Sequence, residues 1–175
     1  ETYQVASKDG QDSSRGGDSS KRLVKWMDEL CVQSKQVDHT TCVLEIGSLS
    51  TRNEISRRYK SIYRIDLNPQ DASIHKQDFM KMEIPRTEKD KFDLVSLSLV
   101  LNFMVSPSDR GDMLKRVCLF LRNPQKQGKK GTVKEKSSGD SGEGSVYPCL
   151  FLVLPLPCIR NSRYLNFEVL KQQIM

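Results

Sequence analysis

The sequence has no long hydrophobic run. Its most apolar stretch, residues 149–158, is short and contains two prolines, whereas a membrane-spanning helix needs about 20 consecutive apolar residues. The first residues are polar and do not form a secretory signal. Because the chain does not begin with methionine, we expect a trimmed chain or a fragment. The composition predicts a protein without a membrane partner.

Residues that build metal and nucleophilic sites are also scarce. The two histidines, His39 and His75, have no cysteines around them at metal-ligand spacing. Five irregularly spaced cysteines do not form a disulfide framework, so we interpret them as buried thiols in a reducing compartment. No catalytic triad or Cys–His motif is present. We expect no metal site, and enzymes that depend on a metal or a covalent nucleophile are disfavoured.

Glycine is sparse where a dinucleotide site would need it. A predicted strand ends at Gly47, and Ser48, Leu49 and Ser50 follow instead of further glycines. The G-x-G-x-x-G fingerprint is therefore absent, which counts against a nucleotide-binding oxidoreductase. A single glycine at a strand end is often only a turn, but it also lets a ligand approach the backbone closely.

The net charge of +6 is concentrated in the last part of the chain. Residues 101–175 hold 12 basic and 6 acidic side chains. This excess fits either a phosphate-facing surface or a solvated lysine-rich loop. Residues 124–145 have almost no large apolar side chain, and such a segment cannot bury a core. We interpret residues 124–145 as a flexible insertion.

Hydrophobic patterning predicts strands that alternate with helices. Strands are expected at residues 41–46, 61–65, 74–76, 92–98 and 149–154, and helices from about residue 18, at 51–59, from 107 and at 164–174. The expected apolar stripes are Leu23, Trp26, Met27, Leu30 and Cys31 in the first helix, and Met113, Leu114, Val117, Cys118 and Leu121 in the third. This alternation indicates an α/β fold with a mostly parallel sheet, helices on both faces, and ligands at the carboxyl ends of the strands.

Two acidic residues stand at predicted strand ends. Asp66 follows Gly47 by nineteen residues, a spacing typical of a carboxylate that accepts hydrogen bonds from ribose hydroxyls. The alternative is a turn-capping Asp before Asn68. Asp78 and Phe79 follow the next strand, where the carboxylate can accept from the amine of an adenine while the Phe79 N–H meets a ring nitrogen. The alternative there is a solvated Asp beside a core Phe.

The predicted strand at 92–98 leads into the remaining candidate residues. Ser96 and Ser98 are small enough for the amino-acid part of a ligand to lie against the backbone. Asn102 and Phe103 come next, and an amide can hydrogen-bond a base edge while a ring can stack on it. For Phe103 a hydrophobic loop is the alternative interpretation.

Several blocks of the sequence together resemble one family. They are YQVASKDGQDSSRGGDSSKRLVKW (3–26), LEIGSLS (44–50), RIDLNP (64–69), QDFM (77–80), SLSLVLNFMVSPSDRGDML (96–114) and LFLVLPLPCIRNSRY (150–164). The chain resembles a Rossmann-like class I S-adenosylmethionine-dependent methyltransferase. Within that class it is similar to the fungal large-subunit (25S) rRNA adenine-N1 methyltransferases. The resemblance covers most of the chain outside the insertion.

The resemblance implies a polar N-terminal arm over residues 1–17 that contributes to the cofactor site, followed by a methyltransferase domain over 18–175. It implies S-adenosyl-L-methionine as cofactor, with Asn102 and Phe103 as catalytic residues. The implied cofactor contacts are Arg15, which would bind the carboxylate, and Gly47, Asp66, Leu67, Asp78, Phe79 and Ser98. Because this fold normally adds a closing pair of strands, we expect that the chain is truncated after the fifth strand.

The implied reaction is methylation of adenine N1 in large-subunit ribosomal RNA. N1 lies on the Watson–Crick edge, so the adenine must be unpaired. Its lone pair is available, and the protein has to align the reactants and exclude water. The resemblance further implies a pre-ribosomal particle as partner and a location in the nucleus and nucleolus. Metazoan relatives include an S-adenosylmethionine sensor of the TOR pathway, so a non-catalytic sensor that acts through a protein partner is the alternative.

Overall fold

The computed structural model describes residues 18–34, 40–124, 146–160 and 166–174. The predicted arm at 1–17, with Arg15, lies outside the described residues, and so does the predicted insertion apart from Pro124. The elements in this section are those of the described part of the chain.

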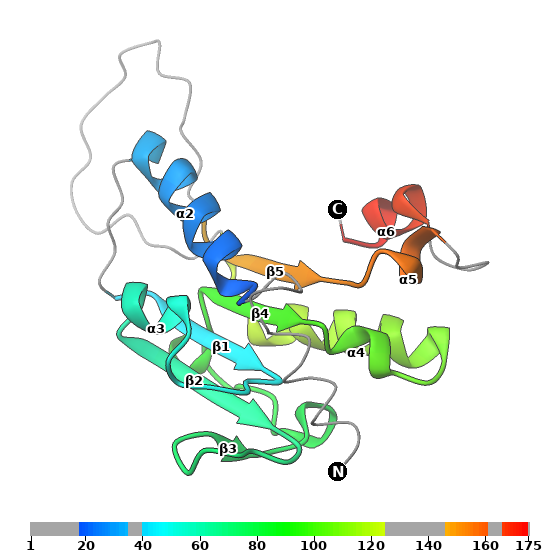
Figure 1. Cartoon of the computed structure of the whole chain (residues 1–175), viewed down its shortest axis with the longest axis horizontal. Helices are drawn as coiled ribbons and strands as arrows, with labels where there is room; N and C mark the ends of the chain where they lie inside the picture. The colour runs from blue at the N-terminus through cyan, green and yellow to red at the C-terminus, as the bar shows by residue number, and fades with distance from the viewer. Residues whose placement is uncertain (1–17, 35–39, 125–145, 161–165, 175) are drawn as a thin grey trace.

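A five-stranded parallel sheet forms the centre of the molecule, in the order β3-β2-β1-β4-β5. Its strands are β1 (Cys42–Ile46), β2 (Ser61–Asp66), β3 (His75–Lys76), β4 (Leu94–Ser98) and β5 (Cys149–Val153). The arrowheads of β1, β2, β4 and β5 in Figure 1 point to the same side of the molecule. The predicted α/β fold with a parallel sheet is confirmed.

Helices connect and cover the strands. They are α2 (Ser20–Ser34), α3 (Glu54–Arg58), α4 (Pro107–Phe120), α5 (Pro157–Arg160) and α6 (Phe167–Ile174), with the 3-10 turns η2 (Phe79–Lys81), η3 (Glu88–Asp90) and η4 (Leu101–Phe103). The helix expected at 51–59 is shorter because Asn53 has an extended backbone and stands at its N-cap. Helix α5 was not predicted, although Pro157 suits the first position of a helix, where its missing N–H is not needed.

Two hydrophobic clusters lie on opposite faces of the sheet. The strands supply both, because neighbouring side chains of a strand point to opposite faces: Val43 and Leu94 belong to one cluster, Leu44 and Val95 to the other. Helices α2 and α3 cover the first face through Leu23, Met27, Cys31, Ile55 and Tyr59. Helix α4 covers the second through Met113, Leu114, Val117 and Phe120. Burial on both faces explains why the residues of β1 and β4 are mostly apolar.

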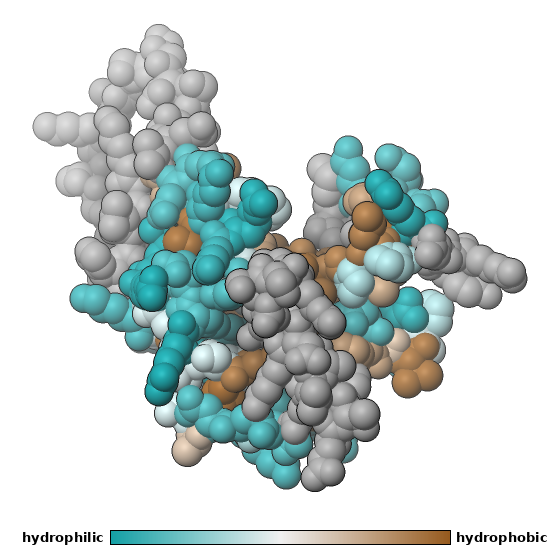
Figure 2. All heavy atoms as spheres, viewed as in Figure 1, coloured by the Kyte–Doolittle hydropathy of each residue, from teal (hydrophilic) through white to brown (hydrophobic). Residues whose placement is uncertain are grey.

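The apolar stripe of α2 is narrower than predicted. Leu23, Met27 and Cys31 are buried, whereas Trp26 and Leu30 are 49% and 47% exposed. The i, i+4, i+8 row faces the sheet, and Trp26 lies at its margin, where its ring meets that of Phe151 edge-on with centroids 6.0 Å apart. Hydrophilic residues dominate the visible surface over α2 and α3 in Figure 2.

The buried face of α4 also differs from the prediction. Phe120 is fully buried, Leu121 is half-buried, and Cys118 is exposed. Phe120 lies seven residues after Met113 and three after Val117, on one side of the helix, while Cys118 points away from that side. The expectation of buried thiols is therefore wrong for Cys118, and it holds fully only for Cys31, because Cys42, Cys149 and Cys158 are half-buried.

Candidate functional site

The candidate residues meet at the carboxyl edge of the sheet. Gly47 directly follows β1, Asp66 ends β2, Asp78 lies two residues after β3, and Ser98 ends β4. Since all these strands are parallel, their ends share one edge (Figure 1). In such sheets this edge forms the ligand crevice.

Gly47 makes a turn that another residue cannot make without strain. Its φ is +75°, and a Cβ at this position would lie 2.4 Å from Cγ2 of Val100. The N–H groups of Gly47 and Ser48 both donate to the carbonyl of Ile65, at 2.9 and 3.1 Å. The chain therefore leaves β1 close to the end of β2, with the segment after β4 pressed against the glycine. The turn reading of Gly47 is confirmed, and its contact with a ligand stays a prediction.

A buried polar network, missed by the sequence analysis, holds the loop after Gly47. Glu45 is 9% exposed and accepts from Arg64 Nε at 3.0 Å and Asn53 Nδ2 at 2.6 Å. Arg64 Nη2 also donates to Ser56 Oγ at 2.6 Å, and that hydroxyl donates to Asn53 Oδ1 at 2.7 Å. Burial raises the pKa of Glu45 even though the Arg64 charge and hydrogen bonds favour its ionised form. The network fixes the start of α3 to the two central strands.

Asp66 is confirmed as a turn-capping residue. Its Oδ1 accepts from the Asn68 N–H at 2.7 Å. Its Oδ2 has no hydrogen bond within the described residues, so the ribose interpretation is compatible with the turn and stays a prediction. Leu67, the next residue, is 66% exposed and can offer an apolar surface beside that oxygen.

Asp78 and Phe79 have an arrangement that suits an adenine edge. Asp78 Oδ1 accepts from the Met80 N–H at 2.9 Å, while Oδ2 lies 3.9 Å from Lys81 Nζ. The Phe79 ring is 3% exposed and packs on Phe120 with centroids 5.0 Å apart, which confirms the core-Phe interpretation. The Phe79 N–H donates to no group in the described part of the chain. An acceptor, Asp78 Oδ2, and a donor, the Phe79 N–H, thus stand on neighbouring residues. The acceptor has only a long ionic contact, and the donor has no partner within the described residues.

Ser98 joins the end of β4 to the start of α2. Its Oγ lies 2.7 Å from Ser19 Oγ. Next to Ser19, Asp18 accepts from the N–H groups of Ser20 at 2.9 Å and Glu54 at 2.8 Å, and so caps α2 and α3 together. A cavity of about 350 Å³ lies beside this junction, and its lining residues are Asp18, Lys21, Ser50, Arg52, Asn53, Glu54 and Arg57.

The segment after β4 carries the predicted catalytic residues. It begins with Leu99 in the left-handed region, at φ 56°, with its N–H donating to the Val153 carbonyl at 3.0 Å. Asn102 and Phe103 lie in η4. Asn102 Oδ1 is buried and has no hydrogen-bond partner among the described residues, and the Phe103 ring is 48% exposed. An unpaired buried acceptor costs about 1–3 kcal/mol, which marks Asn102 as a position where a rearrangement or a ligand would be favourable.

The described residues lack two other kinds of feature. They contain no group of three or more His, Cys, Asp or Glu side chains that could hold a metal ion. None of their helices has the length and apolar character that crossing a membrane requires.

Comparison with known proteins gives a match over the whole chain. The family model described as 25S rRNA (adenine(2142)-N(1))-methyltransferase, Bmt2, matches residues 1–175. The chain belongs to the Bmt2 family. A Saccharomyces cerevisiae protein named 25S rRNA (adenine(2142)-N(1))-methyltransferase is 42% identical over 173 residues, which are 98% of this chain and 43% of the relative.

A second Bmt2-family relative comes from Schizosaccharomyces pombe. It is named 25S rRNA adenine-N(1) methyltransferase and is 37% identical over 177 residues, which are 97% of this chain and 56% of the relative. The chain therefore spans about half the length of the curated relatives that it matches. The five-stranded parallel sheet is the Rossmann-like α/β arrangement expected of a methyltransferase family.

Proposed function

We propose that this chain is the S-adenosylmethionine-binding part of an enzyme that methylates adenine N1 in large-subunit ribosomal RNA. The observation that carries the proposal is the convergence of Gly47, Asp66, Asp78 and Ser98 on the carboxyl edge of a parallel sheet, in a chain that the Bmt2 family model matches from end to end. The two relatives are named for this reaction on 25S rRNA.

The residues at this edge fit S-adenosylmethionine. Asp78 Oδ2 would accept from the adenine amine while the Phe79 N–H donates to a ring nitrogen, and Asp66 Oδ2 would accept from the ribose hydroxyls. The backbone at Gly47 and Ser98 would lie against the methionine part, and Leu67 would cover the adenosine. Arg15 is proposed for the methionine carboxylate, because a guanidinium binds a carboxylate in a bidentate manner.

The chemistry needs orientation more than acid–base catalysis. When bound, the cofactor supplies an activated methyl group on a sulfonium, and adenine N1 has a free lone pair. The tasks left for the protein are to align the nitrogen with the methyl carbon and to exclude water. We assign the orientation of the target adenine to Asn102, through its amide, and to Phe103, through stacking on the base, a contact worth about 1–3 kcal/mol.

The proposal includes the form and place of the substrate. The target adenine is unpaired, because its Watson–Crick edge must reach the site. We propose the pre-ribosomal particle as the physiological setting and the nucleus, with the nucleolus, as the location. The excess of basic residues at 101–175 supports an RNA substrate.

The test uses the full-length protein and changes Asn102 and Phe103 together to alanine. Calorimetry with S-adenosylmethionine should give wild-type affinity for this variant, because neither residue is proposed to hold the cofactor. Methylation of large-subunit rRNA at saturating cofactor should fall at least about ten-fold, in line with the stacking energy. Methylation at the wild-type rate would show that the adenine is held elsewhere. A wild-type protein that binds the cofactor but never methylates rRNA would favour the sensor alternative.

A further inference from the structure

Helix α4 is bonded to two segments of the candidate site. It begins immediately after the η4 segment that carries Asn102 and Phe103, and a reciprocal capping box fixes this start: Ser106 Oγ accepts from the Asp109 N–H at 3.0 Å, and Asp109 Oδ2 accepts from the Ser106 N–H at 3.2 Å. Further along, the same helix contacts the η2 segment that carries Phe79. One rigid element therefore touches the segments proposed for the target adenine and for the cofactor adenine.

Arg116 makes the contact with η2. Its Nε donates to the Phe79 carbonyl at 2.9 Å, and its Nη2 donates to the Met82 carbonyl. The guanidinium carbon lies 5.8 Å from the centre of the Phe79 ring and 5.6 Å from that of Phe120. No ion pair joins Arg116 to a carboxylate within the described residues. Its charge is directed at the carbonyls of the first residue of the turn, Phe79, and of the residue that follows it, Met82.

The η2 turn is therefore held from both ends. Asp78 closes its start by accepting from the Met80 N–H, and Arg116 binds the carbonyl of its first residue, Phe79, and that of Met82, which follows its last residue. Between them stand the Asp78 Oδ2 and the Phe79 N–H. A small rotation of this turn would move both groups away from an adenine edge, so the bond from Arg116 sets the accuracy of that contact.

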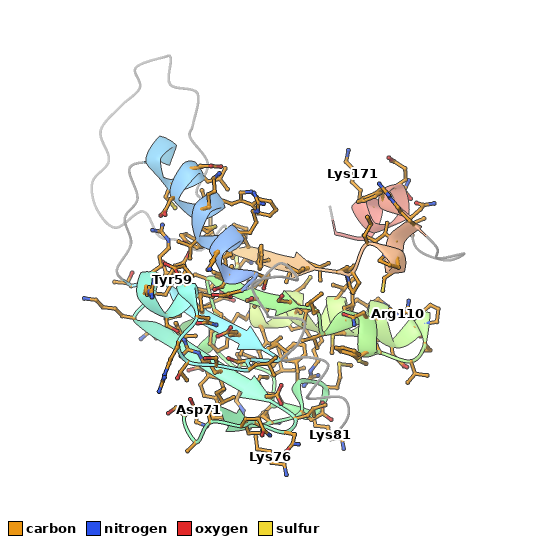
Figure 3. All side chains as sticks on the ribbon, viewed as in Figure 1. Tyr59, Asp71, Lys76, Lys81, Arg110 and Lys171 are labelled. Atoms are coloured by element: carbon orange, nitrogen blue, oxygen red, sulfur yellow. The ribbon has the colours of Figure 1, made fainter. Side chains whose placement is uncertain are left out.

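Arg110 makes the corresponding contact with the acceptor segment. It lies six residues before Arg116 on α4 and projects from that helix in Figure 3. Its Nε donates to the carbonyl of Met104, the residue that ends η4, at 3.2 Å. Arg110 therefore fixes the position of the residues next to Phe103, and within the described part of the chain it has no hydrogen bond to the η2 turn.

We infer that Arg116 and Arg110 are positioning residues with separate tasks: Arg116 sets the Asp78–Phe79 pair against the adenine of the cofactor, and Arg110 sets the Asn102–Phe103 pair against the target adenine. The inference rests on the proposed function. It differs from a structural role because it assigns cofactor affinity to one arginine and the rate of methyl transfer to the other.

The experiment compares Arg116→Met with Arg110→Met in the full-length protein. Arg116→Met should weaken S-adenosylmethionine binding about ten-fold, the loss expected when a hydrogen bond to a charged group no longer holds the recognition pair. The probe for the adenine contact is an S-adenosylmethionine analogue with a dimethylated N6 amine, which cannot donate to Asp78. Because this analogue can still accept from the Phe79 N–H, Arg116→Met should weaken its binding less than it weakens the binding of S-adenosylmethionine.

Arg110→Met should show the opposite pattern. Its affinity for S-adenosylmethionine should equal that of wild type, and its single-turnover methylation of rRNA at saturating cofactor should fall about ten-fold. Arg116→Lys keeps the charge but lacks the planar fork that reaches both carbonyls, so its cofactor affinity should lie between those of wild type and Arg116→Met. If Arg116→Met is unfolded in a thermal melt, Arg116→Lys decides the same question.

The outcomes separate this inference from the proposed function. Cofactor affinity and methylation that fall together in both variants, or a loss by Arg116→Met that is equal for the cofactor and its dimethylated analogue, would overturn the inference and leave the proposed function standing. If both variants bind the cofactor and methylate rRNA as wild type does, the inference is overturned and the proposed function stands. A wild-type protein that does not bind S-adenosylmethionine would overturn the proposed function and the inference with it.

Discussion

Asp66 has two carboxylate oxygens in different surroundings. Oδ1 is engaged by the Asn68 N–H, and we propose that Oδ2 is the group that reaches the ribose. Asp66→Ala removes both and should lower the affinity for S-adenosylmethionine about ten- to a hundred-fold, because hydrogen bonds to charged groups are worth roughly 1.5–3 kcal/mol. Calorimetry measures this loss.

Asp66→Asn is the matched control for that change. Its amide oxygen can still accept from the Asn68 N–H, so the turn is kept, but the negative charge is lost. We expect an affinity between those of wild type and Asp66→Ala. A folded Asp66→Ala protein with wild-type affinity would remove Asp66 from the cofactor site.

Sequence reasoning identified positions better than roles at this scale. For Asp66 and Phe79 the purely structural alternatives, a turn cap and a core ring, are confirmed. The proposed ligand roles depend on other atoms, Asp66 Oδ2 and the Phe79 N–H. Glu45 was missed because its significance depends on Arg64, which lies directly opposite it in the neighbouring strand. That pairing follows from the register of β1 and β2, which the sequence alone does not state.

The Glu45–Arg64 pair connects strands β1 and β2 to the loop after Gly47. The burial of this pair predicts that the free energy of unfolding depends on pH. Burial raises the pKa of Glu45 above the usual 4.5. A raised pKa in the folded state means that the proton favours folding, so this contribution to the free energy of unfolding is fully present below about pH 4.5 and is lost as pH rises through the folded-state pKa.

Glu45→Gln should remove this pH dependence. Glutamine stays neutral, retains an oxygen for Asn53, and leaves an Arg64 that is charged throughout the range. The free energy of unfolding of the variant minus that of wild type should therefore increase from about pH 4.5 towards pH 7, as measured by urea unfolding. Parallel curves for the two proteins would contradict the raised pKa.

The ends of the elements were harder to predict than their existence. Strands β1 and β4 follow from short, mostly apolar runs, since burial on both faces leaves little room for other residues. Strand β2 is only partly buried and β3, which is His75–Lys76, is exposed. Helix α3 begins three residues later than expected because Asn53 caps it. Helix α5 was missed because the two prolines after β5 were considered only as interruptions of an apolar run, whereas the second of them begins a helix.

For the molecule as a whole, alternating strands and helices led to a parallel sheet covered on both faces, and the structure has that architecture. The separation of the two clusters follows from the side-chain alternation along each strand. The predicted edges of the buried helix faces were less accurate, because the exposure of Trp26 and Cys118 depends on how each helix is rotated over the sheet.

The charge of this chain predicts how RNA binding depends on salt. With a net charge of +6 and its excess in residues 101–175, RNA affinity of the full-length protein should fall linearly on a log–log plot between about 50 and 200 mM salt, as counterions are released. Affinity for the small cofactor should change little. Fluorescence anisotropy with an rRNA fragment measures the slope, and a slope near zero would support the solvated-loop interpretation of the basic residues.

Leu99 gives the edge of the sheet a stored conformational energy. A non-glycine residue at φ 56° is less favourable than ordinary backbone by about 1–2 kcal/mol, and its N–H bond to Val153 together with the close approach of Val100 to Gly47 holds it there. Selection for thermal stability alone would favour glycine at this position. Because the leucine lies three residues before Asn102, we expect that increasing the stability of the fold and preserving the geometry of its acceptor segment are opposing demands at this position.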